Sequence, residues 1–484
     1  MTVTVDRRSD LTLEHFRRVS TLGEGVAIGS VAREAMAAAR LAYSELARSG
    51  ESRSGPELLG HRGHGRMVCL GDSFGQPELS EQVVRGIVFA RLADLIEGHG
   101  LCRPEVADML VALLGATMPR VPLGGAISAG ERVVLGRIVG AVGPGRLEPG
   151  EEAALLDGAP CSAALASDAA LRAEQRNALA EAVFALSVEA MNAPLDAYHP
   201  ALGQMWGDKH TKSAIDSLNY WLAGAAQPRR VFQAPVSYRI LPLVLGQARR
   251  AAAEMEQVAR TALGAVTLDV LYLPPSRGNP LGLVLESGGS YQPVYPAMST
   301  LSASSADLCT LADRHSTKLH RAEVSLLPDR LDAKGEGRGA STALLGYVQI
   351  GLGERARHGA ARTVLPASEG GAYDGCDDVA LLSLLAYERE RLVSSQLEAS
   401  LAVLAVVASQ ALDVTGRKIA PRLRPLLGLV RSLVPVTRSQ EPLRQRGDEL
   451  SILTDRLSSM IGSGEVPAFL ALEETGLPAS QAAP

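Results

Sequence analysis

The stretch Val121-Pro-Leu-Gly-Gly-Ala-Ile-Ser-Ala-Gly-Glu-Arg-Val-Val-Leu135 interrupts a chain that is otherwise rich in helix-forming residues. Two prolines and three glycines fall within residues 119–130, and this clustering predicts a loop. A glycine-rich loop can host a functional site, because its backbone can approach a ligand closely, or it can serve as a flexible connection. The residues around the loop bear on which of these applies.

Composition predicts a soluble helical protein. Of the 484 residues, 46% are apolar, 4% are aromatic and 21% are charged, as in proteins built from Ala- and Leu-rich helices. Helical periodicity recurs in long segments, and we predict an all-α fold. The clearest segments are 30–49, 80–99, 104–116, 163–191, 241–265 and 379–413.

The segment 379–413 contains neither glycine nor proline. At about 1.5 Å per residue, a helix of this length would span roughly 50 Å. Such a helix needs partner helices along much of its length and therefore indicates a long bundle. Strand-like alternation occurs at 266–273 and 282–285, on either side of a proline-rich turn, and predicts one small β-hairpin.

Charge and targeting patterns exclude several classes of protein. A formal net charge of −5 provides no basic surface for nucleic acid. The first residues lack the apolar core of a signal peptide, so we expect a cytoplasmic protein. No apolar run approaches the roughly 20 residues that span a bilayer, so no membrane segment is expected. Cysteines without paired spacing predict neither disulfides nor a metal site; they are Cys69, Cys102, Cys161, Cys309 and Cys376.

The opening stretch resembles the segment VPLxGxISASGDLAPL of the aromatic amino acid and histidine ammonia-lyases. In that family an Ala-Ser-Gly tripeptide condenses into methylidene-imidazolone, an electrophilic prosthetic group. Here Ser128 and Ala129 run directly into Gly130 and Glu131, and the tripeptide is absent. We therefore expect a divergent member that has no cofactor. Glu131 and Arg132 would lie where the group normally sits and could fill that space with an ion pair.

Further segments match the family in order and spacing. They are Glu97-Gly-His-Gly-Leu-Cys-Arg-Pro-Glu-Val106, Leu195-Asp-Ala-Tyr-His-Pro200, Gln233-Ala-Pro-Val-Ser-Tyr-Arg-Ile-Leu-Pro242, Ser287-Gly-Gly-Ser-Tyr-Gln-Pro293 and Asp374-Gly-Cys-Asp-Asp-Val379. The resemblance implies an all-α ammonia-lyase fold, similar to fumarase and aspartase. We expect a small N-terminal domain with the site loop in 1–200 and a central bundle of long helices in 201–484. The resemblance also implies a homotetramer whose active sites form where three subunits meet.

Arg239 stands where the family has the arginine that binds the substrate carboxylate. A guanidinium donates two parallel hydrogen bonds to a carboxylate and keeps its proton at working pH. We therefore expect Arg239 to hold a small-molecule carboxylate or amino-acid-like substrate, with a structural ion pair as the alternative. Ser290 and Asp378 stand where the family has an asparagine and a histidine, and the resemblance makes them candidate substrate-binding residues.

The family's catalytic tyrosine falls on Leu58 or Leu59 in this chain, so any base must be a different residue. His61 and His64 lie in the same loop, and imidazole is suited to proton transfer near neutral pH. They are candidate catalytic residues, although two histidines among glycines also fit a solvated loop. A metal site is less favoured, because no further ligand stands at a suitable spacing in this loop.

Three other side chains are candidate catalytic residues. Tyr238 and Tyr291 adjoin matched motif positions and could present phenol groups to the site, or pack in the core with satisfied hydroxyls. Cys376 could act as a nucleophile, but the neighbouring carboxylates of Asp374 and Asp378 would raise the pKa of its thiol. The acidic residues could instead begin the long helix, where the helix dipole favours them.

Two functions remain open. The first is an ammonia-lyase-like enzyme of specialised metabolism without methylidene-imidazolone, which eliminates from, adds to, isomerises or cyclises a small carboxylate by acid–base catalysis. The second is a catalytically inactive homologue that serves as a binding, scaffold or regulatory subunit. Lyase action on phenylalanine, tyrosine or histidine is disfavoured, because enzymes lower barriers by roughly 8–23 kcal/mol and the family's electrophile, base and asparagines are replaced. An activated α-proton would ease that demand.

Overall fold

The computed structural model describes residues 2–49, 77–123, 131–148, 150–231, 233–291, 293–332, 341–361, 379, 381–437 and 443–471. Contacts between residues group the chain into two compact units. Unit 1 comprises Met1–Ala170, Glu254–Met298 and Arg362–Glu388, and unit 2 comprises Leu171–Ala253, Ser299–Ala361 and Arg389–Pro484. Each unit therefore combines three stretches of the chain. A domain boundary at residue 200 stays a prediction.

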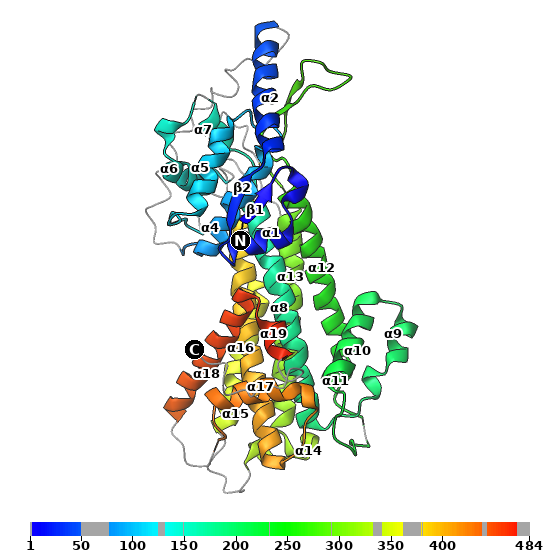
Figure 1. The fold of residues 1–484 in the computed structure, drawn as a ribbon. Helices are drawn as coiled ribbons and strands as arrows, with labels where there is room; N and C mark the ends of the chain where they lie inside the picture. Colours follow the sequence, from blue (N-terminus) through cyan, green and yellow to red (C-terminus); the bar gives the residue numbers. More distant parts are fainter. Residues whose placement is uncertain are drawn as a thin grey trace. The chain divides into compact units, whose positions relative to one another are not determined.

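Four long helices contribute residues to both units (Figure 1). They are α8 (Pro160–Met191), α12 (Leu241–Leu263), α13 (Val294–Leu319) and α16 (Ser383–Thr415). The helices predicted at 163–191, 241–265 and 379–413 correspond to α8, α12 and α16, although α16 begins four residues later than expected. The mainly helical structure confirms the predicted fold class.

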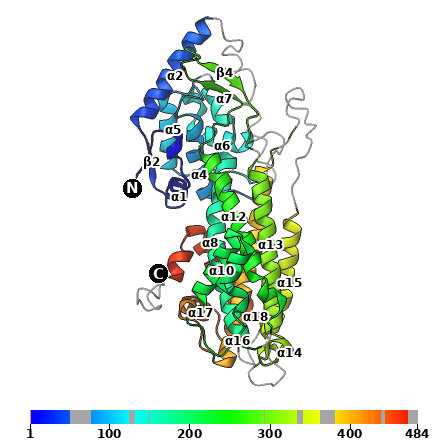
Figure 2. The ribbon, with the colours of Figure 1, turned by 90° about the vertical axis from the view of Figure 1, so that its right-hand side faces the viewer.

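The long helices pack around one hydrophobic core in unit 2. Phe184 of α8, Leu245 of α12 and Leu308 of α13 belong to it, and every residue of α16 from Leu401 to Leu412 is buried. A helix that is apolar on all sides must be enclosed by other helices. The shorter helices of this unit are α9 (Pro200–Trp206), α10 (Lys209–Trp221), α11 (Val236–Arg239), α14 (Ala322–Ser325), α15 (Ser341–Gly359), α17 (Arg424–Leu433), α18 (Leu443–Ser463) and α19 (Val466–Leu470). Figure 2 shows α15 alongside α13.

The length and composition of α16 would allow it to cross a membrane. However, 78% of its most apolar window is buried inside the protein, and no other helix in the described part of the chain is comparable. Such burial is typical of the core helix of a soluble protein.

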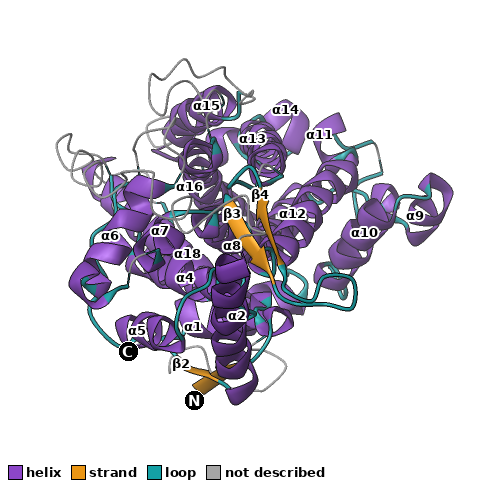
Figure 3. Cartoon of the chain, turned by 90° about the horizontal axis from the view of Figure 1, so that it is seen from above, coloured by secondary structure: helices purple, strands orange, loops and turns teal. Residues whose placement is uncertain are grey.

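Unit 1 combines short helices with two small sheets. Strand β1 (Thr2–Val5) pairs in parallel with β2 (Gly25–Ile28), and β3 (Val270–Leu273) pairs antiparallel with β4 (Leu283–Glu286). The second pair confirms the predicted hairpin, which lies beside α2 in Figure 3. The rings of Tyr43 in α2 and Tyr272 in β3 contact each other edge to face. The helices are α1 (Leu13–Ser20), α2 (Ser30–Ser49), α4 (Glu81–Arg91), α5 (Pro104–Leu114), α6 (Arg132–Val142) and α7 (Glu151–Leu156).

Unit 1 differs from the sequence-based prediction in two places. The sequence did not indicate β1 and β2, which are only four residues each. The helix predicted at 80–99 is shorter than expected. Helix α4 stops at Arg91, and one 3-10 turn follows to Asp94. The buried Asp94 carboxylate accepts hydrogen bonds from Arg91 Nη1 at 3.0 Å and from the backbone N–H of Thr267 at 2.8 Å. This tertiary contact lies at the point where the helix ends.

Candidate functional site

The structure covers only part of the predicted site. Residues 124–130, and with them Ser128, Ala129 and Gly130, lie outside the described residues, as do His61, His64, Cys376 and Asp378. Their proposed roles stay predictions. The remaining candidates divide between the units, with Glu131, Ser290 and Tyr291 in unit 1 and Tyr238 and Arg239 in unit 2.

Glu131 directs its carboxylate at the first turn of α8. Glu131 Oε2 accepts a hydrogen bond from the backbone N–H of Cys161 at 2.6 Å. Glu131 Oε1 accepts from the backbone N–H of Ser162 at 2.7 Å and from its hydroxyl at 2.5 Å. The first N–H groups of a helix have no partner within the helix, and its dipole favours a negative charge there. Glu131, which is only 3% exposed, therefore caps α8.

The side chains around this cap are not set up for nucleophilic chemistry. Burial raises the pKa of the Glu131 carboxyl, although hydrogen bonds from Ser162 and Cys161 oppose the rise. Burial and the adjoining Glu131 raise the pKa of the Cys161 thiol well above its usual value. The hydroxyls of Ser162 and Ser383 lie 2.7 Å apart. Cys161 is therefore a neutral thiol in the core, because only a thiolate is strongly nucleophilic.

Matched motif segments converge beside the same end of α8. Arg132 Nη2 lies 4.0 Å from Asp157 Oδ1, and Asp157 Oδ2 accepts a hydrogen bond from the backbone N–H of Asp269 at 2.7 Å. Gly289 has a φ of +55°, and a Cβ there would lie 3.1 Å from the Cβ of Asp269. Glycine suits both the left-handed backbone and this close approach. The structure thereby joins segments that are distant in sequence.

Ser290 and Tyr291 follow directly after Gly289 and are half-buried. Burial raises the pKa of the Tyr291 phenol, and a hydrogen bond with Thr261 of α12 opposes the rise. Tyr291 is thus a neutral phenol that retains partial contact with solvent. Its role as a catalytic residue stays a prediction.

Tyr238 is fully buried in unit 2. Its hydroxyl lies 3.2 Å from Ser187 Oγ, which lies 3.0 Å from His315 Nδ1, and the rings of Tyr238 and His315 stack with centroids 3.7 Å apart. Burial raises the pKa of the Tyr238 phenol and lowers the pKa of His315 to about 3. Both groups are therefore neutral at pH 7, and this arrangement matches core packing with a satisfied hydroxyl.

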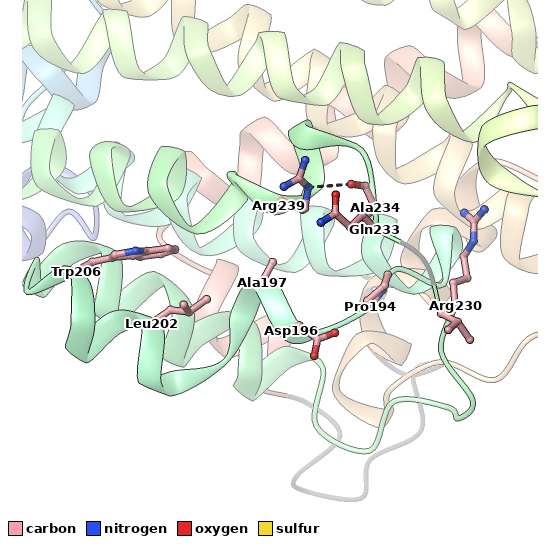
Figure 4. A pocket seen from close by; sticks show the side chains of 10 residues that line it. Pro194, Asp196, Ala197, Leu202, Trp206, Arg230, Gln233, Ala234 and Arg239 are labelled. Atoms are coloured by element: carbon pink, nitrogen blue, oxygen red, sulfur yellow. Dashed lines mark hydrogen bonds between the residues drawn. The ribbon is translucent and has the colours of Figure 1, made fainter.

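A cavity of about 600 Å³ in unit 2 is lined by Arg239 (Figure 4). Asp196, Leu202 and Trp206 line it from the segment that leads into α9 and from α9 itself, whereas Gln233 and Arg239 belong to the segment around α11. The cavity is therefore built mainly from the matched segments 195–200 and 233–242 and from helix α9. Neither Asp196 nor Trp206 stands out as a site residue in the sequence, because only the fold brings them to one cavity.

One nitrogen of the Arg239 guanidinium is hydrogen-bonded within the chain, whereas its terminal NH₂ groups are available to a ligand. Its Nε donates a hydrogen bond to the backbone carbonyl of Ala234 at 3.0 Å, which orients the guanidinium. Within the described residues, no carboxylate lies within ion-pair distance of Arg239. Its two terminal NH₂ groups can therefore donate to an external carboxylate in the bidentate geometry that arginine favours.

Sequence comparison identifies the family. The family model for aromatic amino acid lyases matches residues 141–432, which is more than half of the chain, and the protein belongs to this family. A histidine ammonia-lyase of Geobacillus kaustophilus (strain HTA426) is 26% identical over 397 residues, covering 74% of this chain and 76% of the relative. A histidine ammonia-lyase of Deinococcus radiodurans is 24% identical over 498 residues, covering 91% and 93%.

Solved structures show the same fold. The ergothioneine-degrading enzyme ergothionase from Treponema denticola has a TM-score of 0.82 at 17% identity, covering 95% of this chain and 99% of that one. Tyrosine aminomutase from Streptomyces globisporus has a TM-score of 0.80 at 21% identity, covering 99% and 100%. Both confirm the ammonia-lyase architecture.

Proposed function

We propose that the protein is an ammonia-lyase-like enzyme that acts on an amino-acid-like carboxylate without methylidene-imidazolone. Arg239 carries this proposal, because it lines a cavity and has no acidic partner among the described residues. A structural ion pair would require such a partner. The histidine ammonia-lyases among the relatives support an amino-acid-like substrate.

The residues of this chain do not fit the prosthetic group of the family. No Ala-Ser-Gly tripeptide stands between Val121 and Leu135. The adjoining Glu131 also places its own carboxylate on the N–H groups of Cys161 and Ser162. The proposed reaction therefore proceeds without this electrophile.

The cavity complements a molecule that carries both charges. The terminal NH₂ groups of Arg239 would bind the carboxylate, and the Asp196 carboxylate would attract an amino or quaternary ammonium group. Trp206 can also stabilise such a cation over its ring. Leu202 contributes apolar surface for the rest of the substrate. Together they favour an amino acid or a betaine.

When the substrate nitrogen is quaternary, elimination requires a base from the enzyme but no acid to protonate the leaving amine. A base removes a proton from the carbon next to the C–N carbon, its electron pair forms the double bond, and the C–N bond breaks. A quaternary ammonium group takes the electrons of the C–N bond and leaves as a neutral tertiary amine, without a proton from the enzyme. Because a structural neighbour degrades ergothioneine, ergothioneine and related betaines belong in the first substrate panel beside histidine, phenylalanine and tyrosine.

Substitution of Arg239 tests the carboxylate anchor. Arg239→Gln should weaken binding of the responding panel member at least tenfold, because a charge-assisted hydrogen bond contributes about 1.5–3 kcal/mol. Arg239→Lys should recover part of the loss. The matched control Arg260→Gln removes an exposed arginine on α12 and should leave the affinity unchanged. Calorimetric titration measures the affinity, and absorbance of the unsaturated product measures turnover. Equal affinity in Arg239→Gln would refute the anchor.

Intact-mass measurement tests the absence of the prosthetic group. The purified chain should have the mass of its unmodified sequence. Loss of two waters from residues 126–131 would contradict the proposal directly.

A non-catalytic binding or regulatory subunit is the second candidate. The burial of Tyr238 favours it, because this tyrosine offers no phenol to the cavity. Binding of a panel member at Arg239 without any turnover would support this alternative.

A further inference from the structure

Three arginines lie near the end of α8, which carries a buried glutamate in unit 2. Glu189, near the end of α8, is fully buried and pairs with Arg229 Nη2. Arg417, which follows α16, donates from Nη1 to the backbone carbonyl of Glu189 at 3.5 Å. Arg230 donates to the backbone carbonyl of Val324 at 2.7 Å and also lines the cavity beside Arg239. We call Glu189, Arg229, Arg230 and Arg417 the arginine cluster.

The arginines of the cluster lie close enough to repel one another. Burial and the charge of Arg229 lower the pKa of Arg417, and burial and the charge of Arg417 lower the pKa of Arg230. Glu189 supplies one negative charge against three positive ones. Charges that leave water are costly unless they are paired. The cluster thus carries an excess of two positive charges.

Arg229 shows where a partner is missing. Its side chain is only 8% exposed, and its Nε and Nη1 atoms have no hydrogen-bond partner among the described residues. Buried donors in native proteins nearly always have an acceptor. An exposed arginine could donate to bulk water, but Arg229 is too enclosed for that. Within the described part of the chain, these two atoms therefore lack an acceptor.

We propose that the arginine cluster binds a small oxyanion with two negative charges, either a phosphate group or a dicarboxylate. Such an anion balances the excess charge and supplies acceptors for Arg229, in the geometry that guanidinium groups favour. Arg230 borders the cavity that contains Arg239, but Arg229 and Arg417 are not among the residues that line it. The proposed anion site does not depend on the proposed lyase activity.

Titration of the whole protein with inorganic phosphate and with malonate tests the site. Each anion is added at constant ionic strength against sodium chloride, and binding is measured by calorimetry and by thermal shift. A ligand that binds the folded state raises its melting temperature. Binding of phosphate alone identifies phosphate chemistry, binding of malonate alone identifies a dicarboxylate, and binding of both supports a general dianion site.

Two substitutions should move the affinity in opposite directions. Arg417→Gln should weaken anion binding about tenfold or more, because it removes one of the two excess charges. Glu189→Gln should tighten it, because it adds a net positive charge. Arg417 is preferred to Arg229, whose loss would leave the buried Glu189 unpaired. Arg260→Gln is the matched control.

Arg239→Gln separates this site from the proposed substrate anchor. It should leave phosphate affinity unchanged even if it abolishes substrate binding. The proposal is overturned if neither anion binds the wild-type protein better than chloride up to about 10 mM. It is also overturned if Arg417→Gln binds as tightly as the wild type. The wild-type titration tests whether the anion binds even if the Arg417→Gln variant does not fold.

Discussion

At the scale of single residues, Arg239 and Glu131 show how far sequence reasoning reaches. The motif around Arg239 identified it as a carboxylate anchor, but only the structure shows that Ala234 orients its guanidinium and that no described carboxylate neutralises it. The cap formed by Glu131 could not be predicted, because its partners Cys161 and Ser162 lie some 30 residues further along the chain. Contacts of that separation leave no local pattern.

His315 should make the fold sensitive to acid. Its pKa of about 3 in the folded state lies below the ordinary value of 6.5, because burial disfavours its charged form. Below pH 6.5 the unfolded state binds a proton that the folded state does not. Stability from this group is therefore present above pH 6.5 and is lost as pH falls toward 3. Between pH 7 and 5 the loss should be about 2 kcal/mol.

Urea unfolding of the wild type and of His315→Gln at both pH values measures this contribution. Glutamine can hydrogen-bond but does not titrate, so the variant should lose about 2 kcal/mol less than the wild type over this interval. An equal loss in both proteins would show that His315 is not the acid-sensitive group.

At the scale of elements, local periodicity predicted what short-range sequence controls. The helix expected at 30–49 matches α2, and those expected at 104–116 and 241–265 end within two residues of α5 and α12. The strands β1 and β2 escaped prediction because a parallel pair depends on contacts between segments more than 20 residues apart. The early end of α4 likewise coincides with a contact from Asp94 to the distant Thr267.

A buried ion pair joins α8 to α16 and should be important for stability. Arg176 Nη2 lies 2.8 Å from Glu390 Oε1, both side chains are at most 2% exposed, and Ser394 donates to the same oxygen at 2.5 Å. Glu390→Gln would leave the buried guanidinium without a counter-charge. We expect a loss of about 3–5 kcal/mol in the free energy of unfolding, measured in urea.

The exposed pair of Glu256 and Arg260 on α12 provides the comparison. Its atoms lie 2.6 Å apart, but the side chains are 46% and 56% exposed. Glu256→Gln should therefore cost less than about 1 kcal/mol. Similar losses in the two variants would mean that burial does not determine the contribution of the Arg176 pair.

At the scale of the whole molecule, the homotetramer implied by the family resemblance stays a prediction. Helix α15 presents apolar side chains at helical spacing to solvent, including Leu344, Tyr347, Val348 and Ile350, and Tyr347 is 76% exposed. Such a surface is typical of an interface between subunits. Light scattering should give a mass about four times 50.8 kDa.

Tyr347→Glu should lower that mass, because a charge in an apolar interface is costly. Leu41→Glu changes an apolar residue on α2 that is 63% exposed and serves as the control. A monomeric wild type at micromolar concentration would contradict the prediction, and an unchanged tetramer in Tyr347→Glu would show that α15 is not the interface.

The division of each unit into three stretches has a consequence for synthesis. Unit 1 is complete only after Glu388 has been made, because it needs the β3–β4 hairpin and the beginning of α16 as well as Met1–Ala170. Unit 2 in turn extends to the last residues of the chain. Domains that are continuous in sequence can fold one after another on the ribosome. Neither unit here can be completed in that way, because each needs stretches from distant parts of the chain, and a fragment spanning 1–200 would contain neither unit in full.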